Sequence, residues 1–135
     1  MVGPVRLATR SAAAALMAAC VLALGTAPAQ ARTVSFRMPS SNIFCMYLSS
    51  GGPGAYLRCD VLSRNDVGFE LRRRGRGKRI RITDSVVNRG ARVLRYGRLI
   101  RVGPFGCRSR TSGLTCKSRV SGHGFKLSRE RQRVF

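Results

Sequence analysis

His123 is the first residue to consider for chemistry, because it is the only histidine in this chain of 135 residues. Histidine is the usual general base in enzymes, since its pKa lies near neutral pH. Pairing it with Lys126 would suit cleavage of a phosphodiester. However, no second base or nucleophile follows at a recognisable spacing, and glycines flank the histidine on both sides. The sequence favours a tight turn at His123, with a small hydrolase that uses His123 as the alternative.

The acidic residues give no catalytic pair. The chain has five carboxylates, and they are scattered along it: Asp60, Asp66, Glu70, Asp84 and Glu130. A glycosidase needs two carboxylates held on either side of the scissile bond, and no spacing here indicates such a pair. We expect the carboxylates to form ion pairs with neighbouring arginines, and we expect no cofactor.

The cysteines predict disulfide bonds. Cys20 lies in an apolar leader, which leaves four cysteines in the rest of the chain: Cys45, Cys59, Cys107 and Cys116. An even number in an exported protein favours two disulfides, which we expect to be Cys45–Cys59 and Cys107–Cys116. Zinc ligands are usually two to four residues apart, whereas these pairs are separated by 14 and 9 residues, so we expect no metal site.

The N-terminal segment has the pattern of a secretory signal peptide. Arg6 and Arg10 precede the uncharged run 12–24, and Ala29-Gln30-Ala31 provides a small-x-small cleavage site. The run is shorter than the ~20 residues that a membrane-spanning helix needs. We therefore predict a signal peptide at 1–31 and one secreted or envelope-associated domain at 32–135. Lipoprotein-type processing at Cys20 is the alternative cleavage.

The net charge is the most unusual feature of the composition. The whole chain carries +21, and removal of the two leader arginines lowers this to +19. Such a charge normally attracts polyanions, whether wall polymers, nucleic acid or anionic lipid. The sequence contains no specific nucleic-acid motif. An arginine excess that reflects only base composition explains the charge equally well.

Strand signals dominate after the leader, so we expect an all-β fold of antiparallel hairpins that form a small sheet or sandwich. Thirteen of the 15 glycines lie there and mark turns. The stretch 42–60 reads as two apolar strands joined by a glycine-rich turn. With Cys45 opposite Cys59, Ile43 faces Val61 and Tyr47 faces Leu57, which gives one wholly apolar face.

A second hairpin is predicted over 67–84. A two-residue turn at Gly75-Arg76 places Phe69 opposite Ile82 and Leu71 opposite Ile80. This register would gather five arginines on the solvent face: Arg72, Arg74, Arg76, Arg79 and Arg81. Because like charges directly opposite each other are destabilising, the cluster is either a polyanion-binding site or a solvated face.

The rest of the chain continues the β pattern. The stretch 91–103 alternates as one strand with a bulge or close approach at Gly97. A hairpin over 105–117 follows, for which a bulged three-residue loop would place Cys107 opposite Lys117, one residue away from Cys116. The tail gives a turn, a short strand and a helical turn capped by Ser128.

Five blocks resemble a family of small secreted actinobacterial proteins that contain disulfides and have no known function. The blocks are FRMPSSNIFC, LRCD, VLRYG, SGLTC and GHGFKLSRE, between Phe36 and Phe135. The resemblance implies a third cysteine pair near Ser63 and Arg81, which this chain lacks, and so supports the two disulfides above. It implies no activity.

The sequence thus favours a non-enzymatic exported module with a cationic surface that binds an anionic polymer or the cell envelope. A protein–protein interaction module of the envelope is a further alternative.

Overall fold

The computed structural model describes residues 2–4, 25, 27, 30–49, 54–63 and 67–135. Most of the expected signal peptide and residues 50–53 of the first hairpin loop lie outside the described residues, so the leader stays a prediction. Within the described part, no helix is both long enough and apolar enough to span a bilayer.

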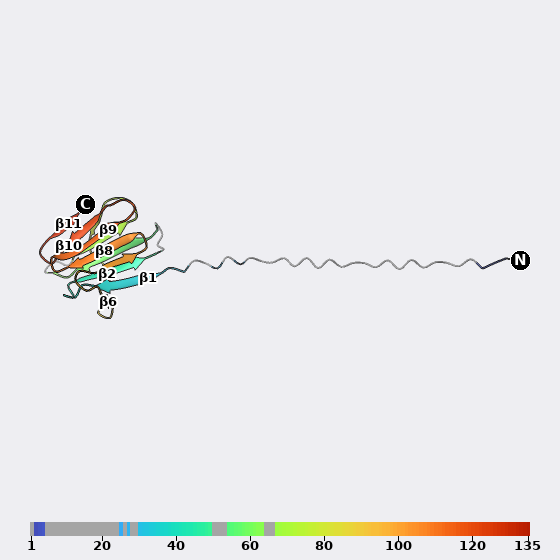
Figure 1. Ribbon diagram of the computed structural model, residues 1–135, viewed down its shortest axis with the longest axis horizontal. Coiled ribbons are helices and arrows are strands. Elements are labelled where there is room, and N and C mark those ends of the chain that lie inside the picture. The colour runs from blue at the N-terminus through green and yellow to red at the C-terminus, as the bar shows by residue number, and fades with distance from the viewer. Residues whose placement is uncertain (1, 5–24, 26, 28–29, 50–53, 64–66) are drawn as a thin grey trace.

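The described residues form two β-sheets and no helix (Figure 1). The first sheet has the order β5-β4-β3-β2-β1-β6, and all its neighbours are antiparallel except β1 and β6. Its strands are β1 (Thr33–Arg37), β2 (Ile43–Leu48), β3 (Tyr56–Val61), β4 (Val67–Arg72), β5 (Lys78–Ile80) and β6 (Arg92–Val93). The second sheet is an antiparallel meander in the order β11-β10-β9-β8-β7. Its strands are β7 (Leu99–Val102), β8 (Phe105–Arg110), β9 (Gly113–Ser118), β10 (Gly124–Leu127) and β11 (Gln132–Val134).

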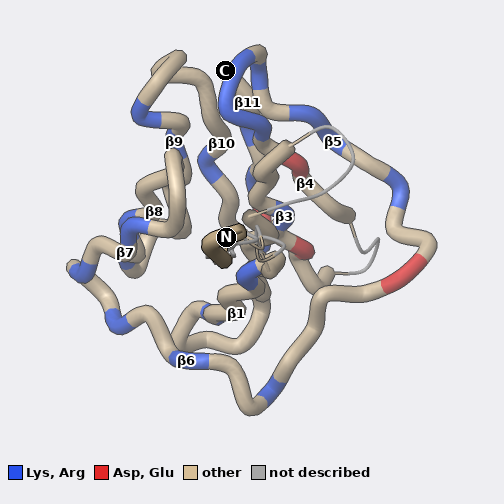
Figure 2. Tube along the Cα trace, turned by 90° about the vertical axis from the view of Figure 1, so that its right-hand side faces the viewer, with Lys and Arg blue, Asp and Glu red and all other residues tan. Residues whose placement is uncertain are grey.

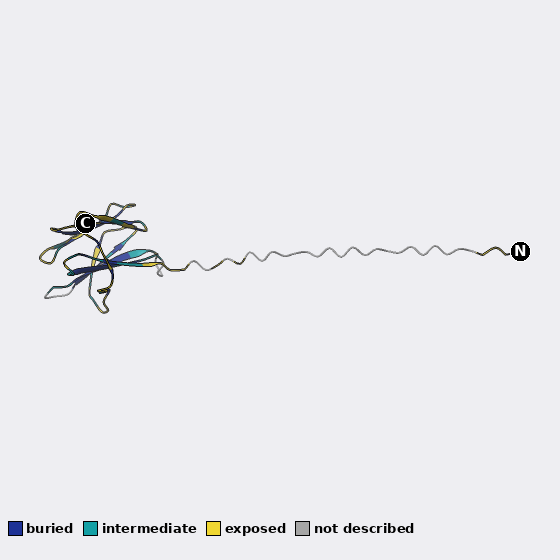
Figure 3. Ribbon diagram, turned by 60° about the horizontal axis from the view of Figure 1, so that its bottom comes forward, coloured by how far each residue is buried: buried dark blue, intermediate teal, exposed yellow. Residues whose placement is uncertain are grey.

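The two sheets pack face to face around one apolar core, which confirms the expected sandwich (Figure 3). Aromatic rings join the layers, since Tyr47 of β2 contacts Phe105 of β8 with ring centroids 6.0 Å apart. Phe69 of β4 and Phe125 of β10 repeat this contact at 6.0 Å. Both disulfides, Cys45–Cys59 and Cys107–Cys116, are present and buried in this core.

The hairpin of β2 and β3 has the predicted register. Ile43 pairs with Val61, Cys45 with Cys59 and Tyr47 with Leu57. The alternation of apolar residues was sufficient to predict this register, because a slip by one residue would turn every core side chain toward the other face.

The hairpin of β4 and β5 has a different register from the predicted one. Phe69 pairs with Arg79 rather than Ile82, and Gly68 pairs with Ile80. The connection spans residues 73–77. It is held by the end of β9, because Ser118 Oγ donates a 2.6 Å hydrogen bond to the Arg73 carbonyl. A tertiary contact to the second sheet therefore sets this loop, not a local two-residue turn.

The single strand expected over 91–103 is two strands in different sheets. β6 pairs with β1 in the first sheet, and β7 pairs with β8 in the second. Gly97 lies in the turn between them with φ of 79°, a left-handed conformation that glycine adopts without strain. This turn, rather than a bulge, carries the chain from one sheet to the other.

The connection of β8 to β9 is shorter than expected. Arg110 pairs with Gly113, which leaves Thr111 and Ser112 as a two-residue turn and brings Cys107 directly opposite Cys116. Gly113 has φ of 132°, and a Cβ there would collide with the Leu127 carbonyl of β10. The glycine thus allows close packing of β9 on β10, and no bulge forms.

The predicted C-terminal helical turn is wrong. Ser128 instead closes a turn between β10 and β11, where its Oγ accepts a 3.0 Å hydrogen bond from Arg131 N. Pairing of Phe125 with Val134 adds β11 to the sheet.

The outer face of the first sheet is covered by the segment that follows β5. Asp60 is fully buried on this face, and its carboxylate accepts hydrogen bonds from Arg58 Nε at 3.0 Å and from Val86 N at 3.1 Å. Arg58 also donates from Nη1 to Asp84 at 2.7 Å. This ion cluster fastens the covering segment to β3.

Candidate polyanion-binding site

The outer face of the second sheet is basic because of the strand alternation. In β8 the buried residues Phe105, Cys107 and Ser109 alternate with exposed Arg108 and Arg110. Successive side chains of a strand point to opposite faces, so these arginines must face solvent once the cysteine faces the core.

Strand register places cations on either side of small residues. Thr115 of β9 pairs with Arg108 of β8 and with Lys126 of β10. One row further along the sheet, Gly106 pairs with Arg101 of β7 and with Lys117 of β9.

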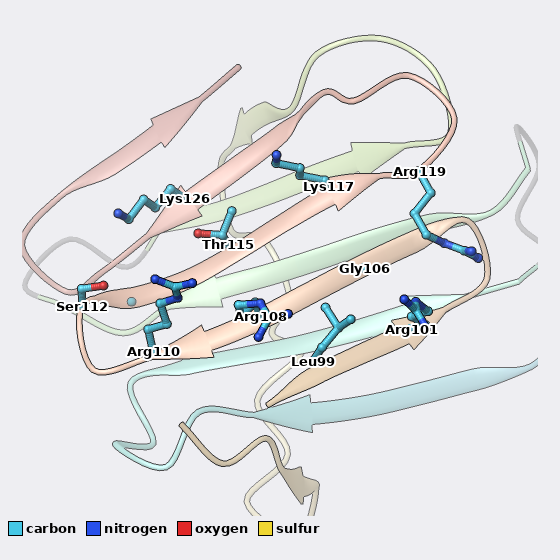
Figure 4. A pocket seen from close by; sticks show the side chains of 11 residues that line it. Leu99, Arg101, Gly106, Arg108, Arg110, Ser112, Thr115, Lys117, Arg119 and Lys126 are labelled. Atoms are coloured by element: carbon cyan, nitrogen blue, oxygen red, sulfur yellow. The ribbon is translucent and has the colours of Figure 1, made fainter. Parts of the chain in front are cut away.

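These rows form a diagonal channel that we call the basic furrow (Figure 4). Gly113, Thr115 and Gly106 form its floor, and the hollow measures about 440 Å³. Each bank carries three cations, and the six are Arg110, Arg108 and Arg101 on one bank and Lys126, Lys117 and Arg119 on the other.

The charged side chains along the basic furrow are all positive. Among the described residues, no acidic side chain lines it, and the ion pairs involve Arg58 and Arg72 but no furrow side chain. In Figure 2 the strands β7, β8 and β9 carry blue segments and no red ones. Two furrow arginines are held by backbone carbonyls: Arg119 Nη2 donates to Gly103 O at 2.6 Å, and Arg108 Nη1 donates to Gly97 O at 3.2 Å.

A second basic groove adjoins the furrow at Arg119, which lines both hollows. Arg72, Arg73 and Arg74 also line this groove. Arg72 is positioned by a 2.8 Å hydrogen bond from its Nε to Glu70 and by stacking 5.4 Å from the centroid of the Tyr56 ring. Two of the five arginines predicted as a site, Arg72 and Arg74, therefore lie beside the furrow.

The other three predicted arginines lie elsewhere. Arg76, Arg79 and Arg81 are exposed and line neither hollow. Because Arg79 pairs with Phe69 while Arg72 shares a face with Glu70, these two arginines point to opposite sides of the sheet. The observed register therefore separates the five arginines that were expected to share one face.

His123 has a backbone role in the turn between β9 and β10. Its carbonyl accepts a 2.8 Å hydrogen bond from Ser118 N, and its N–H donates to Ser121 Oγ at 3.4 Å. Lys126 lines the basic furrow, whereas His123 does not. Among the described residues, no group of three histidine, cysteine or acidic side chains is placed to hold a metal ion.

The sequence reasoning missed the six furrow cations. For Arg108, Arg110 and Lys117 the signal was the alternation of basic with buried residues in β8 and β9, which shows which side chains face out. It does not show that β7 and β10 flank this pair, because strand neighbours depend on the tertiary fold.

The fold and the furrow together define a disulfide-bonded β-sandwich domain with one cationic face. The chain belongs to a family of unknown function (DUF6636), whose sequence profile matches residues 56–135, more than half of the chain. The matched region begins at β3 and includes every residue of the basic furrow. No curated protein and no solved structure matches the chain.

Proposed function

We propose that this protein is a non-enzymatic binding module that holds an anionic polymer in the basic furrow. The observation that carries the proposal is the set of six cations on two facing banks with no acidic residue between them. Cations that form no ion pair with described residues attract anionic ligands from solution, and their fields add along the furrow.

We propose further that the domain acts outside the cell or in its envelope. Two buried disulfides support this location, because such bonds persist in oxidising compartments. The resemblance of several sequence blocks to small secreted actinobacterial proteins supports it as well. In that location the available polymers are acidic wall polymers and extracellular polyanions.

The test compares two variants that lose the same charge. The furrow variant carries Arg108→Ser, Lys117→Ser and Lys126→Ser, and the control carries Arg76→Ser, Arg79→Ser and Arg81→Ser. All six residues are exposed, so both variants should fold. Binding of labelled heparin is measured by fluorescence anisotropy as the salt concentration is raised.

The furrow variant should bind far more weakly, and its plot of log affinity against log salt should be flatter. By analogy with single-stranded nucleic acids, each lost anion contact lowers the slope by about 0.7, so three contacts lower it by about two. The control should keep nearly the parental slope. Equal losses in both variants would show that only net charge matters, and an unchanged furrow variant would refute the proposal.

A further inference from the structure

We infer that the basic furrow accepts one flexible polyanion chain that bears phosphate or sulfate groups and has no bases. Double-stranded nucleic acid and base-bearing single strands are then not the preferred ligands. The inference rests on the proposed function and names the class of polymer that the furrow selects. Four features of the furrow support it: its width, its charge spacing, its lining and its floor.

The width admits a single chain. Arg108 lies on β8 and Lys126 on β10, with β9 between them. Neighbouring strands are about 4.8 Å apart, so the two backbones are separated by roughly 10 Å, and side chains narrow the gap further. A B-DNA duplex comprises a major groove about 12 Å wide together with the strands that border it. The duplex is therefore wider than this gap and cannot lie between the two banks.

The charge spacing suits an extended chain. Successive rows of outward side chains are two residues apart, which is roughly 6.7 Å along a strand. A chain in the furrow would pass three cations on each side, and Arg119 would lead it on toward Arg72 and Arg74. One linear chain can follow this path, whereas a compact anion would use only one row.

The lining offers nothing to a nucleobase. No aromatic residue of the described part of the chain lines the furrow, and Leu99 is the large apolar side chain on its wall. Proteins that bind single-stranded nucleic acid stack bases on aromatic rings, at about 1–3 kcal/mol per base. Five of the six phenylalanines, Phe36, Phe44, Phe69, Phe105 and Phe125, are fully or almost fully buried and cannot supply such a platform. Phe135 is half-buried and Tyr96 is exposed, but neither lines the furrow. Bases should therefore add little to affinity here.

Gly106 leaves the floor of the furrow open, although neither its backbone conformation nor its neighbours require glycine there. A Cβ at Gly106 would have Leu99 Cδ1 at 3.9 Å as its nearest neighbour, and Gly106 has no positive φ. By contrast, a Cβ at Gly113 or Gly124 would strike a backbone carbonyl of a neighbouring strand. A larger residue fits the fold at position 106 but would protrude into the furrow.

Gly106→Leu tests the inference, because it fills the floor and leaves all six cations in place. Long-chain polyphosphate and heparin serve as single-chain probes with phosphate and sulfate groups, and a short DNA duplex serves as the wide probe. Thr83→Leu, at an exposed position outside the furrow, is the matched control. Thermal melting confirms that both variants are folded.

Gly106→Leu should weaken the binding of at least one single-chain probe about tenfold or more. Which of the two probes responds shows whether the furrow takes phosphate, sulfate or both. The weaker binding of the duplex should stay within twofold of the parent, and Thr83→Leu should change none of the three. Equal losses for duplex and single chains, or no loss with either single chain, would overturn the inference.

A second comparison examines the role of bases. An oligodeoxythymidylate and an abasic oligonucleotide of equal length and charge should bind the parental protein within about twofold of each other. Tenfold tighter binding of the base-bearing strand would instead identify the ligand as single-stranded nucleic acid and overturn the inference.

The two proposals fail in different ways. If the triple furrow variant binds heparin like the parent, the proposed function fails. If that variant loses binding while Gly106→Leu keeps it for both single-chain probes, polymer binding stands and the single-chain furrow is refuted.

Discussion

At the scale of residues, the most constrained polar group is the guanidinium of Arg58. Burial alone disfavours its charged form, but hydrogen bonds and charge interactions with Asp84 and Asp60 outweigh this and raise the pKa of Arg58. The same hydrogen bond, followed by the charge of Arg58, lowers the pKa of Asp84 below its usual value of 3.8. Arg58 and Asp84 are therefore both charged throughout the physiological pH range.

Asp84 should make stability depend on acid pH. Because its pKa is lower in the folded protein than in the unfolded chain, its contribution is complete above pH 3.8 and is lost as pH falls through the lowered value. Asp84→Asn should unfold at lower urea than the parent at neutral pH. The size of the effect should be small, because the Asp84 side chain is largely exposed. Urea titrations from pH 2 to 7 check this, and a gap that persists unchanged at the acid end would contradict it.

Alanine should destabilise the protein at position 103 but not at position 106. Gly103 has φ of 53°, and a Cβ there would collide with the Tyr47 hydroxyl, whereas Gly106 has open space above it. Gly103→Ala should cost about 1–3 kcal/mol of unfolding free energy because of overpacking and backbone strain. Gly106→Ala should stay within about 0.5 kcal/mol of the parent. Chemical denaturation measures both, and similar values for the two variants would contradict the packing at Tyr47.

At the scale of elements, each sheet has one disulfide-bonded hairpin facing the core. The β2–β3 bond closes a separation of 14 residues and the β8–β9 bond one of 9 residues. In both hairpins the half-cystines are directly opposite and fully or almost fully buried. The β8–β9 pair lies under the strands that form the floor of the basic furrow.

Removing either disulfide should destabilise the fold by a similar amount. The chain-entropy argument gives about 3 kcal/mol for Cys45→Ala with Cys59→Ala, and slightly less for Cys107→Ala with Cys116→Ala because that loop is shorter. Denaturant unfolding of the two double variants measures this. A loss near zero in either variant would show that the unfolded chain gains no freedom from the missing bond.

The loop 73–77, which connects β4 to β5, packs against the second sheet. A Cβ at Gly77 would lie 2.6 Å from the Gly124 carbonyl, so the loop approaches β10 closely. Together with the bond from Ser118 to the Arg73 carbonyl, this contact holds Arg73 and Arg74 beside Arg119. The loop thereby extends the basic surface of the second sheet instead of forming a separate site.

In the whole molecule, the ion-paired carboxylates are segregated from the basic furrow. Asp60, Glu70 and Asp84 interact with arginines on the first sheet, while the basic furrow occupies the outer face of the second. A net charge of +21 on so small a chain would favour nonspecific attraction from every side. This segregation should concentrate the attraction at the basic furrow.

The leader is expected to be absent from the exported protein. If the sequence is expressed with its leader in a secreting bacterial host, the N-terminal residue of the released product should be Arg32, because Ala29-Gln30-Ala31 fits signal-peptidase cleavage. N-terminal sequencing or intact mass measures this. A lipid-modified N-terminus at Cys20 would instead show lipoprotein-type processing.

Local patterns were sufficient for the β fold, for the register of β2 with β3 and for the Cys45–Cys59 pair. The Cys107–Cys116 pair was also predicted, although the expected bulged loop offset its register by one residue. Alternation of apolar residues decides which face of a strand is buried, and it does so without knowledge of the neighbouring strands. The same patterns failed at 67–84 and at 91–103. There the loop packs against β10, and the chain passes from one sheet to the other, so distant residues set the turns.

The arginine excess and the predicted export signal can be read directly from the chain. The outward orientation of Arg108, Arg110 and Lys117 also follows from alternation, once the disulfide turns Cys107 and Cys116 toward the core. That Arg101, Arg119 and Lys126 join them around Gly106 and Thr115 depends on the packing of the two sheets. The physical reason is that a furrow is formed across four strands, and the order of strands is set by how two sheets bury a shared core. Hydrogen bonds between neighbouring strands then fix the distances between the charged side chains on the surface.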